Sequence, residues 1–86
     1  MGIKLILFSS ERCSVCHALK IKVEELAKEF KAQFEEISID KNPEVAANRL
    51  ILSAPVVILE IDDKEVNRWA GIFSISEIEN FLKRVL

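Results

Sequence analysis

The amino-acid sequence predicts an α/β fold with the element order strand–helix–strand–helix–strand–strand–helix. Three observations carry this prediction: an apolar, β-prone segment at residues 3–8, an amphipathic segment at residues 14–32, and a hairpin pattern at residues 55–70. The chain has 86 residues, half of them hydrophobic, which suits one core and is too short for two. We therefore expect residues 1–86 to form a single domain.

The composition argues against several classes of protein. A formal net charge of −2 disfavours a nucleic-acid-binding protein, because such proteins usually present a basic face. Two Gly and two Pro residues are too few for a disordered chain, and two Cys residues are too few for a disulfide scaffold. No apolar run reaches the ~18–20 residues of a membrane-spanning helix. We therefore expect neither a nucleic-acid partner nor a membrane partner.

The N-terminal half reads as a strand, a helix and a second strand. Residues 3–8 are apolar except for Lys4, as in a strand buried on both faces. Residues 14–32 place apolar side chains at helical spacing, which predicts one inward-facing side of a helix. That side comprises Val15, Ala18, Leu19, Val23, Leu26, Ala27 and Phe30. Residues 34–39 alternate apolar and polar side chains, and a strand–helix–strand unit of this length predicts a parallel pair of strands.

A short second helix is predicted from Pro43 to about residue 50. Asn42 can cap this helix with its side chain. Pro43 suits the first helical position, because its missing N–H would have no partner there.

The C-terminal part predicts a hairpin followed by a last helix. Residues 56–59 are the most strand-like run, residues 62–64 form a turn, and residues 65–70 return as the partner strand. Residues 74–77, Ser-Ile-Ser-Glu, match a capping box in which Ser74 accepts a hydrogen bond from the N–H of Glu77. The inward side of the helix is predicted to comprise Ile78, Phe81, Leu82 and Val85.

The motif Cys13-Ser14-Val15-Cys16 directly follows the first strand, at the start of the first helix. A helix N-terminus favours an anion, so we expect a thiolate at Cys13 with a lowered pKa. Cys16 lies one turn further along, close enough to form a disulfide. Because the thiolate is the attacking species in thiol–disulfide exchange, the motif predicts that Cys13 attacks a substrate disulfide and that Cys16 resolves the mixed disulfide.

Other interpretations of these residues are open. The two cysteines could simply be small core residues. With His17 they complete a c-type haem attachment motif, but the chain has no other His, and its only Met is Met1. A zinc site would find at most three ligands in Cys13, Cys16 and His17, unless subunits share it, whereas a structural site needs four. We expect no metal and no organic cofactor. His17 is either a surface residue or, when protonated, a group that lowers a cysteine pKa.

Pro55 also has two interpretations. It suits the first residue of a strand, where a missing N–H is tolerated. Alternatively, it forms a cis peptide after Ala54, which would expose backbone groups for pairing with a substrate strand.

On these motifs the chain resembles the thioredoxin-like superfamily over nearly all of its length. The resemblance rests on four features: Cys13-Ser14-Val15-Cys16 after the first strand, residues 39–43 (Ile-Asp-Lys-Asn-Pro) before the second helix, Ala54-Pro55 before the third strand, and Gly71 after the fourth. It implies the thioredoxin fold, with a four-stranded mixed sheet in the order 2-1-3-4. The first and third helices would then cover one face and the second helix the other.

The resemblance also implies roles for individual residues. Cys13 would be the nucleophile and Cys16 the resolving thiol. The peptide before Pro55 would be cis, and Pro55 would face the cysteine pair. Gly71 would keep the adjacent groove open. The expected substrate-binding residues are Arg12, Ser14, Val15, Ala54, Pro55 and Gly71.

The chain departs from the family pattern at several positions. Arg12 stands where thioredoxins carry Trp, and Leu7 stands at the position of their buried acid. Glu36 replaces the basic residue that often accompanies this acid. Residues 70–74 lack the double Gly with which glutaredoxins bind glutathione. Trp69 would lie either near the groove or packed on a neighbour of the hairpin.

Together these features predict a thiol–disulfide oxidoreductase that acts on protein disulfides. An unidentified reductase would reduce it back to the dithiol. We expect a monomer. Because the chain carries no recognisable export signal, we expect it in the cytosol, where thiols are mostly reduced. The alternative is a thioredoxin-fold module that handles a metal or binds a protein partner without turnover.

Overall fold

The computed structural model describes residues 2–86 and has the predicted order of elements. The elements are β1 (Ile3–Ser9), α1 (Cys16–Glu29), β2 (Gln33–Ser38), α2 (Pro43–Asn48), β3 (Val56–Ile61), β4 (Lys64–Ala70) and α3 (Ile75–Val85). None of the helices in this part of the chain is long and apolar enough to cross a membrane.

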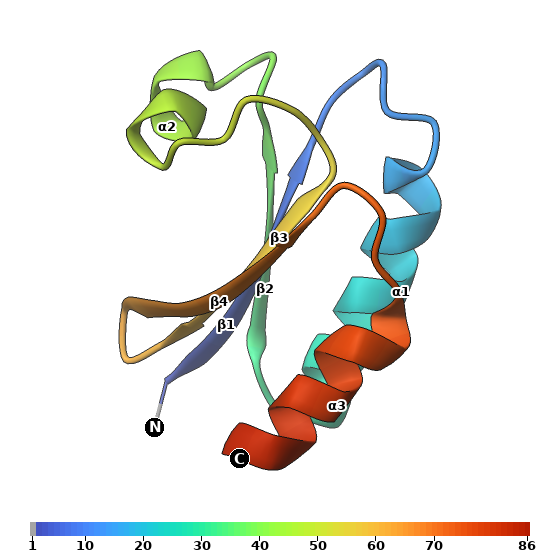
Figure 1. The fold of residues 1–86 in the computed structure, drawn as a ribbon, viewed down its shortest axis with the longest axis vertical. Helices are drawn as coiled ribbons and strands as arrows, with labels where there is room; N and C mark the ends of the chain where they lie inside the picture. The colour runs from blue at the N-terminus through green and yellow to red at the C-terminus, as the bar shows by residue number, and fades with distance from the viewer. Residues whose placement is uncertain (1) are drawn as a thin grey trace.

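The four strands form one mixed sheet in the order β2-β1-β3-β4, which confirms the predicted topology (Figure 1). β1 runs parallel to β2 and antiparallel to β3, and β3 runs antiparallel to β4. Beyond the strand ends, the N–H of Ile39 donates to the carbonyl of Ser9 at 2.8 Å. The carboxyl ends of β1, β2 and β4 and the amino end of β3 therefore meet at one edge of the sheet.

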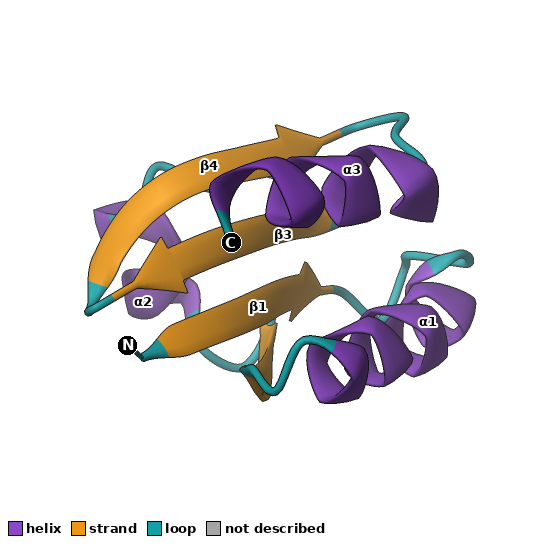
Figure 2. Cartoon of the chain, turned by 90° about the horizontal axis from the view of Figure 1, so that it is seen from below, coloured by secondary structure: helices purple, strands orange, loops and turns teal. Residues whose placement is uncertain are grey.

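Helices cover both faces of the sheet, and the core has two parts. Leu5, Leu7, Val57 and Leu59 pack with Val23, Leu26 and Ala27 of α1 and with Ile78 and Leu82 of α3. Ile6, Phe8, Val56 and Ile58 on the opposite face pack with Ala46 of α2 and with Ile51. Successive strand residues point to opposite faces, so the apolar run of β1 supplies both parts. Figures 1 and 2 show α2 on the other side of the sheet from α1 and α3, as the resemblance implied.

The first helix is shorter than predicted at both ends. It begins at Cys16 rather than near residue 14, and it ends at Glu29 because Lys31 takes a left-handed conformation with φ 56°. The prediction that Val15 and Ala18 lie on the inward side of this helix is therefore wrong. Val15 precedes the helix and is 53% exposed. Ala18 is exposed because the buried side follows Cys16, Val23, Leu26 and Ala27.

Three other local predictions need correction. Asn42 stands at the N-cap of α2, but its side-chain amide donates to the carbonyl of Ser38 at 3.1 Å and makes no cap. α2 ends at Asn48 rather than near residue 50, and Leu50 beyond it takes φ 58°. Val85 is 41% exposed because it lies in the last turn of α3, next to exposed chain-end residues.

The remaining strand boundaries differ from the predicted ones by one or two residues, and β3 extends to Ile61 rather than ending at residue 59. β2 spans Gln33–Ser38, and β4 begins at Lys64, which the sequence pattern places in the turn. The turn itself consists of Asp62 and Asp63, with φ 52° and 67°. Positive φ at both central residues suits the right-handed twist of a two-residue hairpin.

The predicted cap of α3 is present. The hydroxyl of Ser74 accepts a hydrogen bond from the N–H of Glu77 at 3.2 Å. Since α3 contributes Ile78 and Leu82 to the core, this cap supports a helix on which the sheet depends.

We expect Ser74→Ala to lower the free energy of unfolding by about 1 kcal/mol, because it removes the side-chain oxygen that accepts the N–H of Glu77 at the helix start. Ser76→Ala is the matched control, since Ser76 is exposed and lies within the same helix. Urea unfolding followed by circular dichroism measures both. Equal stability of the two variants would contradict the capping role.

Candidate active site around Cys13 and Cys16

Cys13 and Cys16 lie at the sheet edge where the ends of four strands meet. A disulfide joins them, with a Cα–Cα separation of 5.4 Å. Cys16 is the first residue of α1, whereas Cys13 lies in the loop between β1 and α1. The helix N-terminus is therefore at Cys16, and Cys13 stands in the turn before it. The N–H of Cys16 donates to the carbonyl of Cys13 at 3.4 Å, which closes this turn.

The two cysteines differ in accessibility. Cys16 is only 4% exposed, because it begins the buried side of α1. Cys13 is half-buried. A molecule approaching from solvent therefore reaches Cys13 first.

Asp40 holds the loop that carries Cys13. Its Oδ2 accepts hydrogen bonds from the hydroxyl of Ser10 at 3.0 Å and from the N–H of Glu11 at 2.7 Å. These bonds keep the pKa of Asp40 below its ordinary value, the N–H of Glu11 contributing most, and the charge of Arg12 acts in the same direction. The sequence pattern places Asp40 in the segment before the second helix and predicts no role for it. Its position just after β2, beside the end of the parallel β1, is the feature of the sequence that indicates a contact with the loop after β1.

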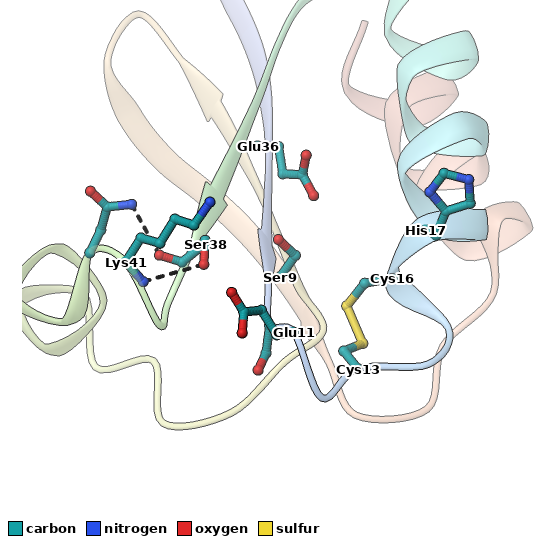
Figure 3. Close-up of a pocket in the computed structure, with 10 residues that line it drawn as sticks. Ser9, Glu11, Cys13, Cys16, His17, Glu36, Ser38 and Lys41 are labelled. Carbon is teal, nitrogen blue, oxygen red and sulfur yellow. Dashed lines mark hydrogen bonds between the residues drawn. A yellow bond between two sulfur atoms is a disulfide. The ribbon is translucent and has the colours of Figure 1, made fainter.

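Two depressions flank the disulfide. The larger, of about 470 Å³, is polar and is lined by Ser9, Ser10, Glu11, Cys13, Cys16, His17, Glu36, Ser38, Lys41 and Asn42 (Figure 3). The second, of about 270 Å³, is lined by Ser10, Arg12, Cys13, Ile39, Leu52, Ser53 and Ala54. Cys13 borders both, so a ligand in either depression lies beside this residue.

The structure brings several sequence-predicted residues together at Cys13. Arg12 and Ala54 share the smaller depression with it, and His17 lines the larger one. Ser14 and Val15 are exposed in the turn between the two cysteines.

Pro55 and Gly71 lie at the same edge of the sheet. The peptide bond between Ala54 and Pro55 is cis, as the resemblance implied. Pro55 directly precedes β3 and lines neither depression. Gly71 follows Ala70, which pairs with Val56. Gly71 has φ +74°, a backbone conformation that favours glycine. A Cβ there would meet no atom within 4 Å, so the preference comes from the backbone and not from lack of space.

The positions that depart from the family pattern are also placed. Leu7 is fully buried in the core and pairs in register with Glu36. Glu36 opens onto the larger depression and forms an ion pair with Lys20 at 3.3 Å. Trp69 of β4 packs edge-on against Phe81 of α3 with ring centroids 5.6 Å apart, so it packs on a neighbour of the hairpin. Residues 2–86 contain no cluster of three or more His, Cys, Asp or Glu side chains arranged to hold a metal ion.

We expect the two thiols of the reduced protein to be alkylated at different rates. Cys13 should react with iodoacetamide several times faster than Cys16, because burial shields the latter. Quenching at partial modification and mapping the labelled peptides by mass spectrometry measures the ratio. Preferential labelling of Cys16 would contradict this difference in accessibility.

Asp40 should contribute to stability in a pH-dependent way. A carboxyl whose pKa is lower in the folded protein stabilises the fold above its ordinary pKa, and this contribution is lost as the pH falls through the folded value. The wild type should therefore be more stable than Asp40→Asn at neutral pH, and the difference should shrink towards strongly acid pH. Urea unfolding across this range tests it. A difference that does not change with pH would rule out titration of Asp40 as its source.

Comparison with known proteins places this geometry in context. The sequence model of the family described as Thioredoxin matches residues 2–84. The SPbeta prophage-derived thioredoxin-like protein YosR of Bacillus subtilis is 32% identical over 83 residues, covering 95% of this chain and 98% of that protein. A thioredoxin of Staphylococcus epidermidis is 32% identical over 72 residues, which cover 81% of this chain and 69% of that protein.

Solved structures of thioredoxins have the same fold as this chain. Thioredoxin 1 of Thermosipho africanus superposes with a TM-score of 0.91 at 36% identity, covering 95% of this chain and 92% of that one. The thioredoxin of Fasciola hepatica superposes with a TM-score of 0.83 at 28% identity, covering 96% and 80%.

Proposed function

The chain belongs to the thioredoxin family and is a thiol–disulfide oxidoreductase, and we propose that Cys13 is its nucleophile and Cys16 its resolving thiol. The observation that carries this assignment is the difference in accessibility between the two joined cysteines. Cys13 borders both depressions from a loop, whereas Cys16 is 4% exposed at the start of α1.

The proposed reaction is two successive exchanges. In the reduced protein, the Cys13 thiolate attacks one sulfur of a substrate disulfide, and the other substrate sulfur leaves as a thiolate that takes up a proton. The Cys16 thiol then loses its proton and attacks the Cys13 sulfur. The bond between Cys13 and the substrate breaks, and the substrate leaves with its second thiol. Two electrons have passed from the protein dithiol to the substrate, and the protein holds the disulfide seen here.

The substrates proposed are disulfides of proteins. The surface around Cys13 is open rather than enclosed, and Ala54 lines the smaller depression together with Cys13. The backbone beside Ala54 and Pro55 precedes β3, so it lies where an extended substrate segment could hydrogen-bond to it. We assign the bordering positions, Arg12, Ser14, Val15 and Gly71, to the same surface.

His17 is proposed to tune the cysteines electrostatically. It lines the polar depression with both of them and stands one residue beyond Cys16. When protonated it would favour a nearby thiolate over the thiol.

The setting proposed is a monomer in the cytosol, part of the electron transport that keeps cellular thiols reduced. A cysteine pair that cycles between dithiol and disulfide suits a compartment whose thiols are kept reduced. A separate reductase would return the disulfide to the dithiol after each turnover.

Replacing each cysteine by serine tests the assignment. Cys13→Ser should lose the reduction of insulin disulfides completely, because the attacking sulfur is gone. Cys16→Ser should instead accumulate a mixed disulfide on Cys13, detected as added mass on the intact protein and released by dithiothreitol. Undiminished insulin reduction by Cys13→Ser would overturn the assigned roles. So would mixed disulfides that accumulate on Cys16 of Cys13→Ser and not on Cys13 of Cys16→Ser.

A further inference from the structure

Asp40 is not part of the cysteine pair, yet it is hydrogen-bonded to the loop that carries Cys13. We propose that Asp40 is a positioning residue that holds Cys13 close to Cys16 in the reduced protein and thereby favours disulfide formation. This proposal rests on the proposed exchange between the two cysteines and adds a determinant of its equilibrium.

The anchor of this restraint is firmly attached to the sheet. Asp40 lies two residues beyond the end of β2, and the preceding Ile39 donates its N–H to Ser9 at the end of β1. One oxygen, Oδ2, accepts both the hydroxyl of Ser10 and the N–H of Glu11. The bonds therefore join two loops that are about 30 residues apart in sequence, as the separations of 30 and 29 show.

Ser10 passes the restraint on to Cys13. Its hydroxyl oxygen also accepts the N–H of Arg12 at 3.3 Å, and its carbonyl accepts the N–H of Cys13 at 3.0 Å. Cys13 is thus connected to Asp40 through a single intervening residue. Cys16 does not depend on these bonds, because α1 and the core already fix it.

The two redox states differ in what holds Cys13. In the oxidised protein the covalent bond to Cys16 fixes it. Reduction breaks that bond, and two kinds of hydrogen bond then restrain the loop: those through Ser10, and the bond from the N–H of Cys16 to the carbonyl of Cys13. Those through Ser10 connect Cys13 to Asp40. Closing a disulfide from a loop that is already positioned costs less conformational entropy than closing it from a mobile loop. The tether therefore raises the equilibrium constant for forming the disulfide.

The charge of Asp40 offers a different explanation, which variants can separate. Removing a carboxylate beside Arg12 would leave this cation free to stabilise a thiolate, which also favours the dithiol. Ser10→Ala removes hydrogen bonds of the tether and keeps the charge of Asp40. Asp40→Asn removes the charge and keeps an amide oxygen that can accept the N–H of Glu11.

The experiment equilibrates each purified protein with reduced and oxidised glutathione. One protein dithiol and one oxidised glutathione give one protein disulfide and two reduced glutathione molecules. Free thiols are counted by alkylation and intact mass. Asp62→Ala is the matched control, because the Oδ1 of Asp62 accepts the N–H of Gly2 at the opposite end of the sheet, and Ala is strained at φ 52°. That variant should be less stable than the wild type while its equilibrium constant is unchanged.

We expect the equilibrium constant for disulfide formation to fall about tenfold in Asp40→Ala. This corresponds to a midpoint reduction potential that is less negative by about 30 mV. Ser10→Ala should lose about fivefold, the worth of roughly one net hydrogen bond, and Asp40→Asn about threefold or less.

Other results would overturn the proposal. Constants of Asp40→Ala and Ser10→Ala within about twofold of the wild type would refute the tether. The tether would also be refuted if Ser10→Ala kept the wild-type equilibrium constant while Asp40→Asn and Asp40→Ala lowered it equally. That result would assign the effect to the charge of Asp40. A wild type that forms no disulfide at any glutathione ratio would refute the exchange itself, whereas a normal wild-type transition that neither variant moves refutes only the role of Asp40.

Discussion

The parallel pairing of β1 with β2 is the constraint on which the site depends. Because the two strands run in the same direction, the loops that follow them leave the sheet at the same edge. The antiparallel β3 begins at that edge, which brings Ala54 and Pro55 there as well. The register matters equally, since a slip of one residue would exchange the two core faces of β1 and rotate the loop before Cys13.

The site combines a rigid part and an accessible part. Cys16 begins a helix whose inner side is buried against the sheet, so its sulfur has a fixed position. Cys13 stands in a loop where another molecule can reach it, and hydrogen bonds replace core packing as its support. Thiol–disulfide exchange needs both properties: one sulfur must meet the substrate, and the second must remain close enough to displace it.

Much of this arrangement could be predicted from sequence because its signals are local. Apolar runs, the capping box at Ser74 and the spacing of Cys13 and Cys16 each lie within a few residues, and they predicted the order of elements and the pair. The order of the strands and the cis peptide at Pro55 came from family resemblance, since neither has a local signature.

Features that depend on distant partners were missed or misassigned. Asp40 binds a loop about 30 residues earlier, and Asn42 donates to Ser38 instead of capping α2 because a carbonyl lies within reach. Val15 fits the apolar pattern of a helix that in fact begins one residue later. Of these three, the contact of Asp40 is the one that only the assembled sheet provides, whereas Asn42 and Val15 follow one local preference in place of another.

A redox titration of the wild-type protein, with peptide mapping at each glutathione ratio, tests the central assignment most directly. The geometry predicts a single two-electron transition in which the thiols of Cys13 and Cys16 disappear together. At intermediate ratios any glutathione adduct should lie on Cys13. Failure of the intramolecular disulfide to form at any ratio, or adducts that accumulate on Cys16 alone, would contradict a redox pair with Cys13 as its reactive member.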